Sequence, residues 1–367
     1  MKDDIYMLWL SSLVHHVGSR KLNFLLEAFG GARAIFDASR ADLREHLQNA
    51  NHAYDHITRD RNLDTIEALL KKMEKQKIAY ISRNNPRYPA LLREIPDAPP
   101  GLFFMGNMPP DGTDKVAIIG SRQCSEYGLL TARLLAQPLA ACGVIVVSGM
   151  ARGVDSMAHR GALQGGGITV AVLGCGVDVC YPAENRQLRD EIIVKGCVIS
   201  EYAPGVRPAP AFFPARNRII SGLCRGVVVT EAGLKSGTLI TVDQAQEQGR
   251  EVMAVPGNIS SKLSQGTNQL IRDGAFPVSG HEDILSILGI ASTPQQKEKE
   301  KIQQNVEIGL ATDEKRVYDN LSLEPISFDM LADVSAIEIG KLHLVCTGLE
   351  LKGLAKKLPG SRYIRNI

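Results

Sequence analysis

The chain has 367 residues, which is too long for one small domain and suggests two or three. Its 44% hydrophobic and 22% charged residues exclude a disordered or fibrous protein. The 42 Lys and Arg residues against 40 Asp and Glu give a net charge of +2, so any nucleic-acid role must rest on a local patch. The seven cysteines form no C-x-x-C pair, which indicates neither a zinc site nor a disulfide framework and favours reduced, buried thiols.

The first 75 residues predict an all-α module. Residues 5–47 read as short helices, with Ser39 as a candidate cap, and Asp3 and Asp4 argue against a signal peptide. No apolar run is long enough for a membrane span, so we expect a cytoplasmic protein. The stretch "VGSRKLNFLLEAFGG" is similar to a helix-hairpin-helix or SAM-like unit, in which Gly18 would open an amide pocket for a phosphate. The second hairpin glycine is absent, which favours packing or partner contact here.

Residues 76–114 are interpreted as a connecting segment, and residues 115–290 as an α/β domain. Six apolar runs alternate with helical segments there: "KVAIIG", "GVIVVSG", "ITVAVLG", "CVISEY", "GVVVTEA" and "EVMAVPG". Apolar strands that end in Gly or Ser and lead into helices are typical of a parallel sheet buried on both faces. The prediction is an extended Rossmann-like, doubly wound core.

The C-terminal part predicts a linker followed by a winged helix. Residues 291–312 are polar and aperiodic, as linkers are. Residues 313–367 fit three helices and a basic β-hairpin, which is the order of a winged-helix domain for DNA or for protein contact. Its third helix offers only Lys341, His343 and Lys352 for contacts with DNA, so protein contact is at least as well supported.

In an open α/β sheet, ligands bind at the carboxyl ends of the strands, so the residues after each strand are the candidates. "VAIIGSRQCSEYG" lacks G-x-G-x-x-G, which disfavours a nicotinamide dehydrogenase, and no cofactor is expected. The residues Gly120 and Ser121 can instead offer backbone N–H groups to an anion, while Arg122 grips a phosphate. Ser148 and Gly149 open the next helix in the same way.

The loop "LKSGTLIT" repeats this arrangement at a second strand. Ser236, Gly237 and Thr238 place small residues and hydroxyls at a helix start, and Lys235 supplies charge. Together with the other loops, it predicts a surface along which a sugar-phosphate chain can lie.

The segment "FFPARNRIISG", residues 212–222, follows a Pro-rich connection and should lie over the strand ends. A ring for base stacking beside cations for phosphates is the composition that single-stranded nucleic acid needs. We assign Phe213, Arg216, Asn217 and Arg218 to binding and Phe212 to the core. Which of the two arginines contacts DNA, and which a carboxylate such as Glu231, stays open.

The acidic residues and His159 near the strand ends are candidates for structural or catalytic roles. Asp155 and His159 are interpreted as structural because no matching nucleophile is near. Asp178, Glu201 and Glu231 each follow a strand and are equally well acids or bases, helix caps, or partners of the arginines.

In order, the motifs "VAIIGSRQCSEYG", "VVSGMARGVDSMAHRGAL", "TVAVLGCGVDVCYPAEN", "FFPARNRIISGL", "EAGLKSGTLIT" and "VPGNISSKLSQGTNQLIRDGA" resemble the DprA (Smf) family of DNA-processing proteins. The resemblance covers roughly residues 115–280. It implies a homodimer that binds single-stranded DNA and loads the RecA recombinase during natural transformation, with no known enzymatic activity. It implies that Phe213 stacks on a base and that Arg122, Arg216, Asn217 and Arg218 hold phosphates. Some relatives carry a lysine in the loop just before the aromatic residue, whereas this chain has "VRPAPAFF", so that either Arg207 substitutes for the lysine or the contact is lost.

Two other functions remain alternatives. The core is also similar to nucleotide phosphoribohydrolases of the LOG type, but "LKSGTLIT" has Thr241 where their catalytic glutamate stands. Loss of that carboxylate should abolish hydrolysis and leave anion binding intact. The other alternative is a regulator that binds duplex DNA through the winged helix.

Overall fold

The computed structural model describes residues 2–48, 50–291, 310–322 and 325–365. The chain divides into two units, Met1–Ser292 and Thr293–Ile367, which are treated separately below. Residues 292–309, which carry most of the predicted linker, lie outside the described residues. None of the described helices is both long and apolar enough to cross a membrane.

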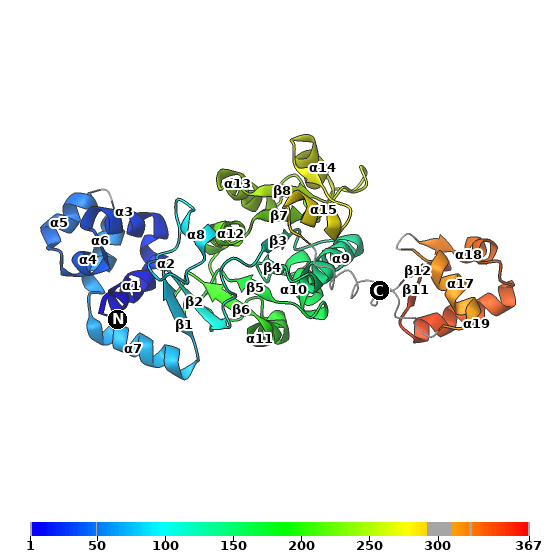
Figure 1. Cartoon of the computed structure of the whole chain (residues 1–367), viewed down its shortest axis with the longest axis horizontal. Helices are drawn as coiled ribbons and strands as arrows, with labels where there is room; N and C mark the ends of the chain where they lie inside the picture. The colour runs from blue at the N-terminus through cyan, green and yellow to red at the C-terminus, as the bar shows by residue number, and fades with distance from the viewer. Residues whose placement is uncertain (1, 49, 292–309, 323–324, 366–367) are drawn as a thin grey trace. The chain divides into compact units, whose positions relative to one another are not determined.

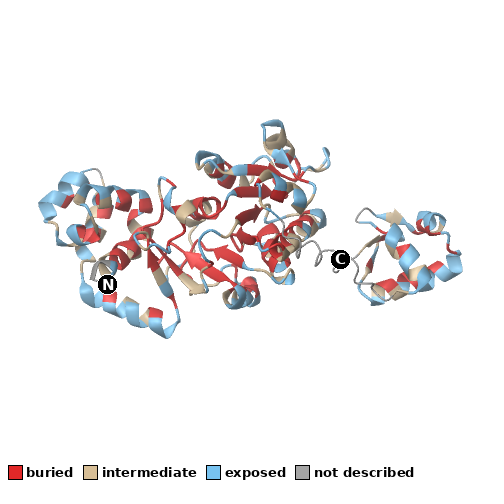
Figure 2. Ribbon diagram, in the orientation of Figure 1, coloured by how far each residue is buried: buried red, intermediate tan, exposed pale blue. Residues whose placement is uncertain are grey.

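A nine-stranded sheet forms the centre of the first unit (Figure 1). All six predicted strands are confirmed and pair in parallel: β3 (Lys115–Ile119), β4 (Ile145–Ser148), β5 (Thr169–Val172), β6 (Cys197–Ser200), β7 (Gly226–Val229) and β8 (Glu251–Ala254). Every residue of β3 to β7 is buried, because helices cover both faces of the sheet (Figure 2). The Rossmann-like core that the sequence predicts is therefore present.

The segment 76–114 contributes strands of its own. β1 (Ala79–Ser82) pairs antiparallel with β2 (Gly101–Gly106), and β2 pairs antiparallel with β6. A short strand, β9 (Phe276–Pro277), completes the opposite edge beside β8. The sheet order is β1-β2-β6-β5-β4-β3-β7-β8-β9. Residues that the sequence interpretation treated as a connection thus extend the sheet.

The strand order reverses between β3 and β7. The chain runs from β3 outward through β4 and β5 to β6, then returns to lay β7 on the other side of β3. At such a point the connecting helices leave toward opposite faces, which opens a crevice at the carboxyl ends of the two strands.

Two sets of helices cover the two faces of the sheet. One face packs against α9 (Glu126–Ala141), α10 (Val154–Gln164), α11 (Arg186–Lys195) and α15 (His281–Ile287). The other packs against α8 (Ala90–Arg93), α12 (Phe212–Gly222) and α13 (Thr238–Glu247). A further helix, α14 (Gln265–Arg272), lies near β8. Helix α12 begins at Phe212, so Phe213 lies in its first turn.

The N-terminal module is all-α, as predicted. Its helices are α1 (Lys2–Ser12), α2 (Val14–Val17), α3 (Ser19–Phe29), α4 (Ala32–Asp37), α5 (Arg40–His46), α6 (Asn51–Arg59) and α7 (Leu63–Lys75). Ser39 caps α5, accepting from the Asp42 N–H while the Asp42 carboxylate accepts from the Ser39 N–H. The module's apolar residues share one core with Phe103, Val198 and Tyr202 of the sheet region.

The second unit is a winged helix. Three helices, α17 (Thr312–Asn320), α18 (Phe328–Ser335) and α19 (Ile339–Leu351), precede a hairpin of β11 (Ala355–Leu358) and β12 (Arg362–Arg365). A short strand, β10 (Ile326–Ser327), completes a three-stranded sheet in the order β10-β12-β11. The helices and the sheet enclose a separate core around Val317, Leu331 and Leu342.

Candidate nucleic-acid interface

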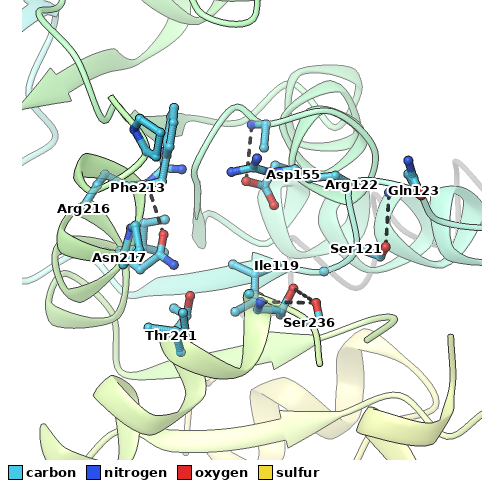
Figure 3. Close-up of a pocket in the computed structure, with 18 of the residues that line it drawn as sticks. Ile119, Ser121, Arg122, Gln123, Asp155, Phe213, Arg216, Asn217, Ser236 and Thr241 are labelled. Carbon is cyan, nitrogen blue, oxygen red and sulfur yellow. Dashed lines mark hydrogen bonds between the residues drawn. The ribbon is translucent and has the colours of Figure 1, made fainter. Parts of the chain in front are cut away.

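A cavity of about 680 Å³ opens at the carboxyl ends of β3 and β7, in the crevice where the strand order reverses. Figure 3 shows Phe213, Arg216 and Asn217 of α12 on one side and Ser121, Arg122 and Gln123 on the other. The predicted residues that line it are Gly120, Ser121, Arg122, Phe213, Arg216, Asn217, Ser236, Gly237 and Thr238. The structure thus brings together the loop after β3, helix α12 and the loop after β7, which are far apart in the sequence.

The loop after β3 contributes an exposed cation. Arg122 is exposed, and its guanidinium carbon lies 5.2 Å from the centroid of the Phe213 ring. The Ser121 N–H already donates to the Glu231 carbonyl at 2.9 Å. The N-terminus of the following helix holds the Glu231 carboxylate, which accepts from the Ser125 N–H at 2.8 Å. Because an internal anion occupies that helix end, Arg122 is the group of this loop that is left for an external phosphate.

Helix α12 presents an aromatic and polar stripe to the cavity. Phe213, Asn217 and Ile220 line it with spacings of four and three residues, which places them on one helix face. The Phe213 ring lies 5.4 Å from the Tyr181 ring with an interplanar angle of 32°. Phe212 instead stacks on Tyr202 at 4.4 Å and packs against the core, as expected from the sequence. The two neighbouring phenylalanines therefore have separate roles.

Arg216 is a buried cation at the cavity wall. Its guanidinium donates to the carbonyls of Gly149, at 2.6 Å, and Val172. Burial lowers the pKa of Arg216, and the charge of the Asp155 carboxylate opposes that shift. Gly149 permits this approach, because a Cβ at that position would lie 2.6 Å from the guanidinium. The hydrogen bonds of Arg216 go to neutral oxygens, including Asn217 Oδ1 at 3.2 Å, and the Asp155 carboxylate partly offsets its charge.

Four of the predicted binding residues do not line the cavity: Ser148, Gly149, Arg218 and Lys235. Ser148 is fully buried and donates to the Ile118 carbonyl at 2.7 Å, so it holds two strands together. Arg218 is buried on another side of α12, with Nη2 2.5 Å from Glu201 and Nε 3.1 Å from Asp97. Of the two arginines, Arg216 faces the cavity, and Arg218 pairs with carboxylates other than Glu231.

The loop after β7 brings a helix N-terminus to the cavity. The Ser236 hydroxyl donates to Thr238 Oγ1 at 3.0 Å, and the Thr238 N–H donates to Ser236 Oγ at 3.3 Å. The positive end of the α13 dipole points toward the space that these residues line. Lys235 is exposed beside the cavity on the same loop.

The carboxylates are engaged in structural bonds. Asp155, the one carboxylate among the described lining residues, accepts from the N–H groups of Gly149 at 3.2 Å and Ala151 at 3.3 Å. Burial raises the pKa of Asp155, with the charge of Arg216 acting against the shift. His159 is fully buried against Thr169, with its Nδ1 2.7 Å from the Thr169 hydroxyl. Asp178 pairs with Lys72 at 3.0 Å.

The hairpin at Gly18 is tied to the protein interior by the residue that follows it. Gly18 has φ of +83° and precedes α3, as the hairpin interpretation requires. The first residue of α3, Ser19, is buried and donates its hydroxyl to Glu201 Oε2 at 2.6 Å. This favours the packing interpretation of the hairpin.

Sequence reasoning did not include Tyr181 among the binding residues. It lines the cavity, is 45% exposed, and lies beside Phe213. The feature of the sequence that could have indicated Tyr181 is its place in "CGVDVCYP", an aromatic residue in the loop after a strand. Ile240 and Thr241 also line the cavity, from the first turns of α13.

In the winged helix, the candidate DNA contacts of α19 are engaged within the domain. Lys341 pairs with Asp313, and Lys352 lies 2.7 Å from Glu314. His343 stacks on Phe328 at 4.2 Å.

The fold and the cavity define a class: a doubly wound α/β protein with a crevice lined by aromatic, cationic and hydroxyl side chains, and with an appended winged helix. The family model of DNA recombination-mediator protein A matches residues 79–289, and that of the DprA winged helix domain matches residues 303–361. The chain belongs to the DNA recombination-mediator protein A family, DprA or Smf, and the resemblance seen in the motifs is confirmed.

Individual relatives agree with this assignment. Protein Smf of Synechocystis sp. is 32% identical over 97% of this chain and 98% of its own length. The structure of DNA processing protein A from Streptococcus pneumoniae is 39% identical, with a TM-score of 0.64 over 78% of this chain and 97% of that chain. A structure of DNA processing protein A from Helicobacter pylori, which describes a single-stranded DNA binding mode, is 30% identical with a TM-score of 0.52. It covers 58% of this chain and 95% of that chain.

Proposed function

We propose that this recombination mediator binds single-stranded DNA in the cavity between β3 and β7. The observation that carries the proposal is the meeting of the Phe213 and Tyr181 rings with Arg122 and the N-terminus of α13. The bases of a single strand can stack on aromatic side chains, whereas in a duplex the base faces are already stacked on neighbouring base pairs. The contacts are with rings and phosphates, so binding is independent of base sequence.

Each group has a part in this proposal. Phe213 stacks on a base, and Tyr181 extends the aromatic surface. Arg122, Asn217 and the hydroxyls of Ser236 and Thr238 hold phosphate oxygens, while Lys235 attracts the strand at the rim. Arg216 contributes charge from inside the wall. Gly149 leaves room for the Arg216 guanidinium, and Gly237 lets the backbone come close to the ligand. Gly120 lets the end of β3 pack closely against Val154 and Thr230.

The test is fluorescence anisotropy with a labelled oligothymidine and its duplex over a series of salt concentrations. The expected result is tighter binding of the single strand and a log K that falls linearly with log salt, by about 0.7 per phosphate contact. Equal or tighter binding of the duplex, or no dependence on salt, would overturn the proposal.

The wider role that we propose follows the family: the chain protects incoming single strands and loads the RecA recombinase during natural transformation. Its compartment is then the cytoplasm, where RecA meets DNA. We further propose a homodimer, supported by Phe276 of the edge strand β9, which is 45% exposed. Pro277 in the same strand has no N–H, so such a pair would form through side chains rather than by strand pairing.

Two measurements test this role. RecA-driven strand exchange on DNA coated with single-strand-binding protein should speed up when the chain is added, and no acceleration would contradict loading. Sedimentation should give a dimer that dissociates in Phe276→Asp, whereas exposed Phe24→Asp in the N-terminal module is the control. A wild-type monomer at all concentrations would contradict the dimer.

We propose that the cavity is not a hydrolytic site. Thr241 lines it where the LOG-type enzymes have a catalytic glutamate, and Asp155 is tied to two backbone N–H groups. No lining carboxylate among the described residues is left to stabilise an oxocarbenium charge. Incubation with nucleoside monophosphates should release no free base above background, and release that Asp155→Asn abolishes would establish the enzyme alternative.

A regulator that reads duplex DNA through the winged helix is less well supported. Lys341 and Lys352 neutralise Asp313 and Glu314, and α19 exposes Leu344 and Leu351 instead. Lys341→Ala and Lys352→Ala should therefore leave duplex affinity unchanged. A tenfold loss in either variant would restore the duplex alternative.

A further inference from the structure

Helix α12 has two functional sides. Phe213, Arg216 and Asn217 line the cavity, whereas Arg218 points into the protein. Successive residues of a helix are about 100° apart, so Arg216 and Arg218 face nearly opposite directions. A displacement of Arg218 therefore moves the helix that carries Phe213, Arg216 and Asn217, three of the proposed DNA contacts.

Arg218 is the centre of a buried polar network that joins four segments of the chain. Its guanidinium lies 2.5 Å from Glu201, which follows β6, and 3.1 Å from Asp97, which precedes β2. Glu201 also accepts the Ser19 hydroxyl of the N-terminal module at 2.6 Å. The next turn of the same module helix, α3, adds Asn23, whose amide donates to the Ala98 carbonyl at 2.9 Å. The module thus forms a hydrogen bond with Glu201, one acidic partner of Arg218, and another with Ala98, the neighbour of the other partner, Asp97.

A second tie involves the neighbouring residues. Phe212, at the start of α12, stacks on the ring of Tyr202, with the ring centroids 4.4 Å apart. Tyr202 directly follows Glu201 in the sequence. Both rings pack in the core that the N-terminal helices share with the sheet. Helix α12 is therefore held at Phe212 and at Arg218. Phe212 packs in the core that the module shares, and the partner of Arg218, Glu201, bonds to Ser19 of the module.

The Arg218–Glu201 pair at the centre of the network is buried, whereas the Asp97 side chain is 38% exposed. Arg218 is 6% exposed and Glu201 is 1% exposed. The charges of Glu201 and Asp97 outweigh burial and raise the pKa of Arg218. If one partner moves away, an uncompensated buried charge remains, which is among the most costly changes in a protein interior. The seating of α3 and the position of α12 should therefore change together.

We propose that Arg218 is a positioning residue through which the N-terminal module sets the DNA-binding geometry of α12, so that module seating and single-strand binding are coupled. The proposal rests on the proposed function of the cavity. Coupling of this kind is reciprocal: a well-seated module tightens DNA binding, and bound DNA stabilises the seating of α3.

The experiment compares two serine variants of the same module in the full chain. Ser19→Ala removes the bond to Glu201, and Ser12→Ala is the matched control because its hydroxyl bonds only to the Trp9 carbonyl. Ser19→Ala should weaken oligothymidine binding about fivefold, the lower end of typical coupling, with an unchanged salt slope. Ser12→Ala should bind like the wild type.

Hydrogen exchange of α3 gives a readout that simple destabilisation would not move. In the wild type, oligothymidine should slow amide exchange in residues 19–29, and in Ser19→Ala this protection should disappear while α12 is still protected. Arg218→Met adds a separate check: its affinity should fall with no change in salt slope, because Arg218 meets carboxylates and not phosphate.

The outcomes are distinct. If the wild type binds the oligonucleotide but α3 exchange is unaffected and Ser19→Ala binds normally, the coupling is wrong and the DNA site stands. A salt slope lowered by about 0.7 in Arg218→Met would make that arginine a phosphate contact and overturn its positioning role. If the wild type does not bind the oligonucleotide, the proposed function fails and the coupling fails with it.

Discussion

The Arg122 guanidinium carbon lies 5.2 Å from the centroid of the Phe213 ring, although Arg122 follows β3 and Phe213 lies in the first turn of α12, the helix before β7. A cation at this distance from a ring is attracted by the ring's electron-rich face. The pair therefore joins the two sides of the crevice, and it places a phosphate-binding group beside a surface on which a base can stack.

Removal of the ring should weaken binding without changing its salt dependence. Phe213→Ala is expected to cost about 1–3 kcal/mol of single-strand affinity, the usual value for one stacked base. Phe212→Ala is not a neutral comparison because that ring is packed against Tyr202, so exposed Phe24→Ala serves as the control. Anisotropy at several salt concentrations measures both quantities, and unchanged affinity would place the base elsewhere.

Removal of the Arg122 guanidinium should, unlike removal of the ring, change the salt dependence of binding. Arg122→Ala is expected to reduce the salt slope by about 0.7, because one phosphate contact is lost. Arg33→Ala is a suitable control, since Arg33 is exposed and pairs with Asp37 in the N-terminal module. An Arg122→Ala slope equal to that of the wild type would show that this arginine does not meet phosphate.

Two glycines of the predicted site should respond differently to alanine. A Cβ on Gly149 would lie 2.6 Å from the Arg216 guanidinium, whereas one on Gly237 would meet no heavy atom within 4 Å. Gly149→Ala should therefore lower the free energy of unfolding by about 1–3 kcal/mol, as overpacking does. Gly237→Ala should leave it unchanged or raise it slightly. Thermal unfolding measures both, and equal melting temperatures for the two variants would contradict the close contact.

The N-terminal module should lose stability in mild acid. The His16 ring lies 3.8 Å from His15 and 3.7 Å from His56. Burial, followed by the charges of His15 and His56, lowers the pKa of His16 to about 4. An unfolded histidine has a pKa near 6.5, so between pH 6.5 and 4 the unfolded chain binds more protons at this site. Stability should therefore decrease as the pH falls through that window.

Trp9, the one tryptophan of the chain, reports on this module because its indole N–H donates to the Asp60 carbonyl. Urea unfolding followed by Trp9 fluorescence at pH 7.5, 6 and 5 measures the effect. His16→Gln should flatten the pH dependence, and His46→Gln, an exposed position in the same module, should not. A wild-type midpoint that is constant from pH 7.5 to 5 would contradict the prediction.

The sequence was sufficient to locate the strands and loops that form the crevice. β3 and β7 are apolar runs that end in Gly, Ser or Thr, and their order along the chain implies a parallel sheet. Strands β1 and β2 were not predicted, because "AYIS" and "GLFFMG" are short, stand among prolines, and gain their hydrogen bonds only from pairing with each other and with β6.

The roles of Arg216 and Arg218 could not be separated in sequence. Helix geometry turns them apart, but which side faces the crevice depends on how α12 packs against the sheet. The partner of Arg218, Glu201, lies after a different strand, and Ser19 lies in another module. Such networks are non-local, and no pattern around "ARNR" encodes them.

The two borders of the sheet have a consequence for crowding on DNA. Helix α1 packs against β1, and the opposite border, β9, consists of two residues, one of which is a proline. Neither border offers a long row of unpaired backbone groups to a neighbouring copy. Copies of the chain that meet at high local concentration therefore have only short strand edges of this sheet to pair, which disfavours β-aggregation through it.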